Sequence, residues 1–249
     1  MIEKEKEGIR WLEFELLQEE RCHLAHAVFL RHGGVSQKPY DSLNLGGGSG
    51  DDPSLVAINR QRVLSVLPSS DPVSGYQVHG DHIEVVRKGW NFEGGCDGLI
   101  TEEKKRSLMI KHADCQAAIF YDPMQRRLAN VHCGWRGNVQ NIYQKTVEKM
   151  KALGSKEENI LVCISPSLGP KWAEFVNYEQ ELLPSFLEFR VGERHFDLWE
   201  ISRNQLIKAG VLDAHIEIAK RCTYENSEDY FSYRRDKVTG RLATVAVLC

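Results

Sequence analysis

Residues 128–154 read LANVHCGWRGNVQNIYQKTVEKMKALG and contain the clearest change from strand to helix in the chain. The β-rich run 128–133 predicts a strand, and the glycines that follow it predict a turn. After Asn138, apolar residues recur at helical spacing, and Gly154 can take the left-handed conformation that ends a helix. The predicted helix has one apolar face, made of Val139, Ile142, Tyr143, Thr146, Val147, Met150 and Leu153.

Strand patterns outnumber helix patterns in the rest of the chain. The helices do not alternate regularly with the strands, so a doubly wound parallel sheet or a βα barrel is disfavoured. We predict the α+β class, in which mixed β-sheets carry helices on their outer faces, as a single domain over residues 1–249. The other predicted strands are 11–17, 23–30, 82–86, 107–121, 159–164 and 242–248.

Three more helices are predicted outside the opening stretch. The first covers 53–67, because Asp52 can cap it and Pro53 fits its first turn. The others are 198–209, which ends at Gly210, and 178–187, which Pro184 interrupts.

The composition is that of an ordinary globular protein, with 42% apolar and 27% charged residues. A formal net charge of -3 provides no basic field for a nucleic acid, so no nucleic-acid partner is expected. Uncharged runs are much shorter than the about 20 residues of a spanning helix, and residues 1–6 lack an apolar leader, so we expect no membrane partner and a cytoplasmic location. The sequence assigns no oligomeric state.

The seven cysteines are scattered and form no CxxC pair, which disfavours a disulfide scaffold or a zinc ribbon. Three segments look unlike packing sequence, namely 77–80 (QVHG), 111–115 (KHADC) and 132–137 (HCGWRG). Two imidazoles and a thiolate, from His79, His132 and Cys115, suit zinc and leave its fourth position open. A single His or Cys in a strand is more often a buried core residue, and spacing alone leaves both interpretations open.

Weaker candidates surround these three segments. The free N–H groups at the start of the helix after Asn138 favour an anion such as phosphate. The glycine loop, residues 45–50 (LGGGSG), lacks the ending of a P-loop and is predicted to be a flexible loop. Asp114 is predicted to be structural rather than a general base. The run 230–235 (YFSYRR) can stack a base and neutralise phosphate, but an edge strand is favoured.

Taken together, these segments resemble the YfiH-type family, also called the multicopper polyphenol oxidoreductase or DUF152 family, whose members include bacterial purine nucleoside phosphorylases. The resemblance spans nearly the whole chain. Three departures stand out: Cys133 replaces a small Ala, Gln116-Ala117 replaces a stretch where Pro is usual, and the loop 165–170 is altered. The matching stretches are 31–36, 42–45, 52–53, 59–60, 77–80, 113–115, 132–137, 222–223, 231–235 and 240–241.

The resemblance implies that His79, Cys115 and His132 are both the metal ligands and the catalytic residues, with Zn²⁺ or alternatively Cu²⁺ as the ion. It implies phosphorolysis of adenosine, inosine, guanosine and methylthioadenosine, and deamination of adenosine. The partners are then purine nucleosides and phosphate. We assign phosphate or sugar contacts to Asn44, Arg62 and Arg136.

Other functions use the same residues. A copper-dependent, laccase-like polyphenol oxidase needs several coppers, usually held by HxH pairs, and none occurs among the nine histidines. A cysteine hydrolase could use Cys115 as the nucleophile and His79 or His132 as its base. A cytidine-type deaminase lacks its HxE and PCxxC signature. A binding module without turnover is the remaining class.

Overall fold

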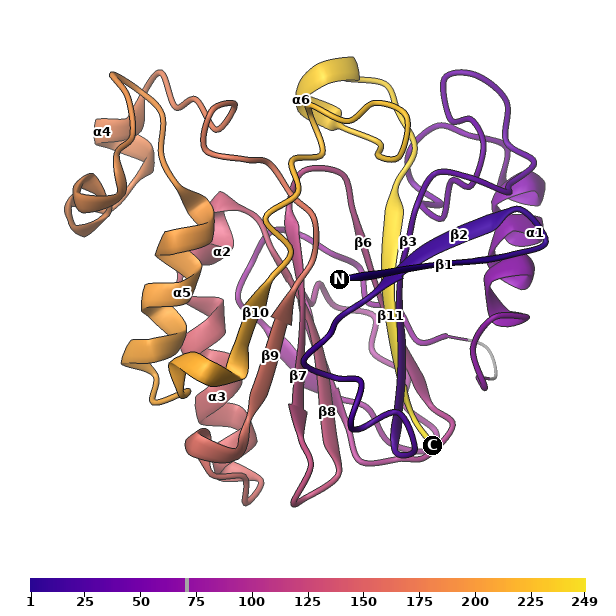
Figure 1. Cartoon of the computed structure of the whole chain (residues 1–249), viewed down its shortest axis with the longest axis horizontal. Helices are drawn as coiled ribbons and strands as arrows, with labels where there is room; N and C mark the ends of the chain where they lie inside the picture. Colours follow the sequence, from indigo (N-terminus) through magenta and orange to yellow (C-terminus); the bar gives the residue numbers. More distant parts are fainter. Residues whose placement is uncertain (70–71) are drawn as a thin grey trace.

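The computed structural model describes residues 1–69 and 72–249 and contains two β-sheets packed face to face (Figure 1). One sheet has five strands, and every neighbouring pair in it is antiparallel. Its strands, in spatial order, are β1 (Ile2–Lys6), β2 (Ile9–Glu13), β3 (Leu24–Phe29), β11 (Leu242–Leu248) and β6 (Ser107–His112).

The other sheet has six strands and is mixed. Its two edge strands, β10 and β4, pair in parallel with their neighbours, whereas the inner pairs are antiparallel. Its strands, in spatial order, are β10 (Ile216–Ile218), β9 (Leu161–Ile164), β7 (Gln116–Asp122), β8 (Arg127–Cys133), β5 (Gly98–Thr101) and β4 (Ile83–Val85).

Apolar side chains from both sheets fill the space between them. Leu108 and Leu242 of the first sheet share one buried cluster with Ile119 and Leu128 of the second. A polar side chain also joins the sheets, because the buried amide of Asn130 donates to the carbonyls of Leu108 and Thr244, both at 2.9 Å. These two bonds link strands of both sheets and help to fix how the sheets align.

Helices cover the outer faces of the two sheets (Figure 1). α1 (Pro53–Leu64) packs through Val63 against the five-stranded sheet. α3 (Ile142–Ala152) and α5 (Leu198–Lys208) pack through Val147 and Leu206 against the six-stranded sheet. This arrangement confirms the predicted α+β class. In the described part of the chain, no helix is long and apolar enough to cross a membrane.

Several predicted element bounds are wrong. The predicted strand 107–121 is two strands, because Asp114 takes a left-handed φ of +89° and its carbonyl accepts from the Leu168 N–H at 2.9 Å. The β-rich runs on both sides of 111–115 predict one strand, and the break between them is what places Cys115 in a turn.

The helix predicted after Asn138 is also two helices. α2 (Trp135–Val139) begins directly after the extended Gly134. Asn141 then takes a φ of +55° and caps α3 through its side chain, which accepts from the Gln144 N–H at 3.3 Å. The predicted apolar stripe is correct, but one left-handed residue interrupts it.

The edge strand predicted at 230–235 is wrong, because Ser232 caps a short helix, α6 (Tyr233–Asp236).

Strands β1, β5 and β10 were not predicted, since they are short and β1 is largely charged. The interruption predicted at Pro184 is confirmed. The remaining short helices are η1 (Glu157–Asn159), α4 (Tyr178–Glu181), η2 (Pro184–Phe189) and η3 (Asp213–His215).

Candidate functional site

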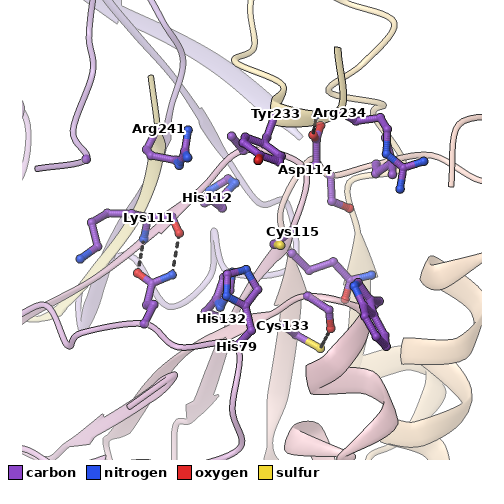
Figure 2. A pocket seen from close by; sticks show the side chains of 18 of the residues that line it. His79, Lys111, His112, Asp114, Cys115, His132, Cys133, Tyr233, Arg234 and Arg241 are labelled. Atoms are coloured by element: carbon purple, nitrogen blue, oxygen red, sulfur yellow. Dashed lines mark hydrogen bonds between the residues drawn. The ribbon is translucent and has the colours of Figure 1, made fainter. Parts of the chain in front are cut away.

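His79, Cys115 and His132 converge in space although they are far apart in the chain (Figure 2). Their ligand atoms all lie within 4.8 Å of one another. His79 comes from a loop, Cys115 from the turn between β6 and β7, and His132 from β8. The two imidazole rings meet edge to face, with 4.8 Å between their centroids. This is the one such group of His, Cys, Asp or Glu side chains among residues 1–69 and 72–249.

Asp97 organises this group, and the sequence reasoning missed it. Its fully buried carboxylate accepts the Nδ1 hydrogen bond of His132 at 2.7 Å. It also accepts the backbone N–H groups of Val78, His79 and Gly80 at 2.8 to 3.1 Å. These bonds hold the left-handed turn at His79, whose φ is +60°. One carboxylate therefore positions two of the three converging side chains.

The role of Asp97 can be recognised only when the pairing register of its strand is known. Asp97 directly precedes β5, and its neighbour Gly98 pairs with Val131, next to His132. The His132 N–H also donates to the Asp97 carbonyl at 2.6 Å. Because the sequence analysis did not predict β5, it could not place Asp97 opposite His132.

The charges of the group favour a thiolate. Burial raises the pKa of the Cys115 thiol, but the charge of His132 and hydrogen bonds from both imidazoles outweigh burial and lower this pKa to about 6. Burial lowers the pKa of His132, whereas Cys115 and Asp97 raise it to about 9. Burial raises the pKa of Asp97, but the His132 and backbone N–H bonds bring it below its usual value.

The arrangement of donors fits one zinc-type ion. With Nδ1 of His132 donating to Asp97, Nε2 is left as the ligand atom, and a carboxylate behind an imidazole is the usual support for a metal-bound histidine. Zinc bonds to nitrogen and sulfur measure about 2.0 to 2.3 Å, so small side-chain rotations bring all three donors within reach of one ion.

The group lies in a cavity of about 740 Å³. Part of its wall is apolar, where Trp135 and Phe175 meet edge to face with 6.1 Å between ring centroids. Asp114 is the only acidic residue in the wall, among the residues that the structure describes. The basic residues of the wall are Lys111, Arg136, Arg234, Lys237 and Arg241.

The three predicted substrate contacts have different positions. Arg136 lines the cavity, with its guanidinium 4.5 Å from the Trp135 ring centroid. Arg62 is exposed outside the cavity and donates to the Gly33 carbonyl at 2.8 Å. Asn44 is fully buried, and its amide bonds to Ser49 and Asp51. Arg136 therefore lines the cavity, whereas the side chains of Arg62 and Asn44 do not.

Two segments with other predicted roles contribute to the cavity. Residues 46–49 of the glycine loop line it, and so do Tyr233 and Arg234 from the run that was predicted to be an edge strand. The helix start to which the phosphate site was assigned is not part of this cavity, because α3 begins at Ile142 and Asn141 is not in the cavity wall.

Asp114 has the predicted structural role. Its carboxylate accepts from the Thr223 hydroxyl and the Arg234 N–H, both at 2.6 Å, which ties the turn before Cys115 to α6. Cys133 lines the cavity as a buried thiol, and burial raises its pKa well above the usual value. Cys133 is not one of the three residues whose ligand atoms lie within 4.8 Å of one another.

Comparisons with known proteins agree with one another. A family model described as multi-copper polyphenol oxidoreductase laccase matches residues 25–249. The purine nucleoside phosphorylase YfiH of Escherichia coli (strain K12) is 33% identical over 225 residues, which cover 86% of this chain and 89% of that protein. A purine nucleoside phosphorylase of Deinococcus radiodurans is 35% identical over 238 residues, covering 92% and 91%.

Two solved structures share the fold. The crystal structure of YlmD from Geobacillus stearothermophilus is 29% identical, with a TM-score of 0.88, and the match covers 98% of this chain and 97% of that one. The Bacillus licheniformis hypothetical protein YfiH is 26% identical, with a TM-score of 0.88 and 99% coverage of both chains.

Proposed function

The chain belongs to the YfiH-type family of multi-copper polyphenol oxidoreductases, and from this membership and its site we propose that it is a metal-dependent purine nucleoside phosphorylase. The observation that carries the proposal is the convergence of His79, Cys115 and His132 in a cavity whose wall is both cationic and aromatic. Relatives named purine nucleoside phosphorylase support the substrate class.

The proposed ligands of the metal are His79, Cys115 and His132, with Zn²⁺ as the ion. When bound, such an ion supplies Lewis acidity and an open coordination position. Asp97 holds the Nδ1 proton of His132, which keeps the other ring nitrogen of His132 directed to the site. The lowered pKa of Cys115 keeps its sulfur in the ligating thiolate form near neutral pH.

The cavity wall suits both substrates of phosphorolysis. A purine can stack against the rings of Trp135 and Phe175, and the basic side chains can neutralise phosphate. In the reaction, a phosphate oxygen bonds to C1′ of the ribose while the bond from C1′ to purine N9 breaks. The electron pair of that bond stays on the purine, and the proton of hydrogen phosphate passes to the purine overall. The products are a free purine and ribose 1-phosphate.

The test is a phosphate-dependent assay on protein of known metal content. Inosine and phosphate should give hypoxanthine, a chelator should abolish turnover, and zinc should restore it. Ammonia release from adenosine in the same preparation tests the deamination that the family resemblance implies. Absence of phosphate-dependent hypoxanthine formation by zinc-loaded protein would contradict the proposed phosphorylase.

A multi-copper oxidase needs further clusters of ligands. The described residues hold one group of three, which is enough for one ion, and no second group accompanies it. Phenol oxidation by copper-loaded protein, compared with zinc-loaded protein, tests this alternative. Sustained oxidation that depends on more than one copper per chain would favour the oxidase over the phosphorylase.

A cysteine hydrolase is the second candidate, and one observation favours it. Cys115, His132 and Asp97 form a nucleophile, a base and an orienting carboxylate, with the base 2.7 Å from the carboxylate and the pKa of the thiol lowered to about 6. A bound ion masks the thiolate. Rapid alkylation of Cys115 by iodoacetamide in protein as isolated would favour the hydrolase, and slow alkylation that a chelator accelerates would favour the metal centre.

A further inference from the structure

The cations of the cavity are not equivalent. Arg234 is occupied, since its Nη1 donates to the carbonyls of Trp172 and Glu174. Arg136 is exposed and stacks on Trp135. Lys111 and Arg241 are half-buried and lie on the same flank of the cavity, across His79, Cys115 and His132 from Cys133 (Figure 2). The Nη1 of Arg241 donates to the carbonyls of Thr239 and Gly240 at 2.8 and 3.0 Å, which fixes its guanidinium in the wall.

The glycine loop closes this flank next to the two cations. A Cβ at Gly46 would come within 2.5 Å of Cγ of Arg241, and one at Gly47 would lie 3.7 Å from Nη2 of Arg60. Glycine at position 46 is therefore what lets the loop approach Arg241. The N–H groups of Gly47 and Gly48 donate to no acceptor in residues 1–69 and 72–249, and these two residues form a turn that Ser49 follows. Successive backbone N–H groups without protein acceptors are a frequent anion-binding element.

One carboxylate, that of Asp114, lies in the described cavity wall, and its charge opposes the effect of burial on the pKa of Arg241. Asp114, the acidic residue of the described cavity wall, already accepts from Thr223 and Arg234. Within residues 1–69 and 72–249, the ammonium group of Lys111 donates to the Gly75 carbonyl alone, at 3.2 Å. Burial, together with the charge of Arg60, lowers the pKa of Lys111 to about 8, as expected for cations gathered without a counter-ion. Burial likewise lowers the pKa of Arg241. A bound anion would offset the repulsion between Lys111 and Arg60 and would replace the water that burial takes from Arg241.

We propose that Lys111, Arg241 and residues 47–49 form the subsite for a tetrahedral oxyanion, which we name the anion corner. The inference rests on the proposed function for the identity of the ligand, which is then the attacking inorganic phosphate. The opposite, aromatic flank at Trp135 and Phe175 is left for the purine, and the ribose lies between them beside His79, Cys115 and His132. The corner therefore sets the direction in which the nucleoside binds.

The substitution Lys111→Met tests the anion corner with little risk to folding. Gln77 bonds only to the backbone of residue 111, through the Lys111 N–H at 2.9 Å and the Lys111 carbonyl at 2.7 Å, so these bonds survive the change. Loss of one charge-assisted contact should raise the Kd for inorganic phosphate, measured by calorimetry, about tenfold or more. The KM for phosphate should rise similarly, while the KM for inosine stays within about twofold.

Matched variants locate the effect. Lys111→Arg should restore most of the phosphate affinity, because it restores the charge. Lys171→Met removes the same charge from a side chain that is 74% exposed outside this cavity, and should leave the Kd unchanged. If Arg136→Met weakens phosphate binding and Lys111→Met does not, phosphate binds on the aromatic flank and the anion corner is wrong.

The experiments distinguish a wrong anion corner from a wrong proposed function. Wild-type protein that forms hypoxanthine, together with an unchanged phosphate Kd in Lys111→Met, overturns the corner and leaves the phosphorylase intact. Phosphate binding that Lys111→Met weakens, in a wild-type protein without phosphorolysis, supports the corner and removes the phosphorylase. Wild-type protein that does not bind phosphate at millimolar concentration overturns the corner.

Discussion

His132 and His26 are both buried histidines in strands, and they have opposite electrostatic properties. His132 is 3% exposed in β8, and His26 is 5% exposed in β3. Burial lowers the pKa of His26 to about 4, and its Nε2 accepts the Phe14 N–H at 2.8 Å. His132 instead donates to the Asp97 carboxylate and contacts Cys115, which raise its pKa to about 9.

The difference teaches that burial by itself makes a neutral core histidine. A backbone N–H pointing at an imidazole nitrogen requires that nitrogen to be unprotonated, whereas a carboxylate and a thiolate favour the protonated ring. The same side chain therefore becomes structural or functional through its neighbours. The predictions below test this contrast.

The largest effect is expected when Cys115, which faces His132, is replaced. Cys115→Ala deletes the thiolate that faces His132 and leaves two imidazoles, which hold zinc weakly. Metal content measured after purification should fall from one ion per chain to a small fraction. Phosphorolysis measured as kcat/KM should fall about 1,000-fold or more. Full metal content in Cys115→Ala would mean that Cys115 is not a ligand.

The next effect concerns acid stability at His26. Its pKa in the folded state is below the ordinary value, so its contribution to stability is complete above pH 6.5 and is lost as the pH falls towards 4. Between pH 7 and pH 4.5 this should cost about 2 kcal/mol of unfolding free energy.

Urea denaturation of wild type and His26→Gln at both pH values measures this term. The glutamine variant starts less stable, but its loss on acidification should be smaller than that of wild type by about 2 kcal/mol. Equal losses in the two proteins would show that His26 titrates normally in the folded state.

A smaller effect is expected from the partner of His132. Asp97→Asn keeps a hydrogen-bonding group of similar size but removes the carboxylate charge behind the imidazole. The Kd for zinc, measured by chelator competition, should rise about 10- to 100-fold. Asp97→Ala is the less conservative comparison, because it also removes the acceptor for the N–H groups of Val78, His79 and Gly80. Unchanged zinc affinity in Asp97→Asn would refute the role of the charge.

The smallest effect is expected at Arg62, which is compared with Arg136 as the two histidines were compared above. Arg62 lies outside the cavity and Arg136 lines it. Arg62→Gln should change the KM for phosphate and for inosine by less than about twofold, since exposed side chains away from a site contribute little. A large increase in either KM would show that the cavity described above is not where the substrates bind.

The sequence alone determined the class of the fold and the identity of the converging residues. The apolar stripe from Val139 to Leu153 predicts an outer helix, because helical spacing is a local property. The resemblance to the YfiH-type family, carried by segments 77–80, 113–115 and 132–137, selected His79, Cys115 and His132, and their convergence agrees with it. Spacing is enough for the helix, whereas the three site residues needed the family resemblance, because spacing alone leaves a buried core role open.

Only the tertiary structure decided which other side chains belong to the site. Asp97 reaches His132 because β5 pairs with β8, and Lys111 lies near the start of β11, which follows Arg241, because β6 pairs with β11. Asn44 and Arg62, which the sequence favoured, are directed elsewhere by hydrogen bonds to Ser49, Asp51 and Gly33. Long-range strand register sets these contacts, and a one-residue shift in register turns a side chain to the opposite face of its sheet, so local sequence patterns do not contain them.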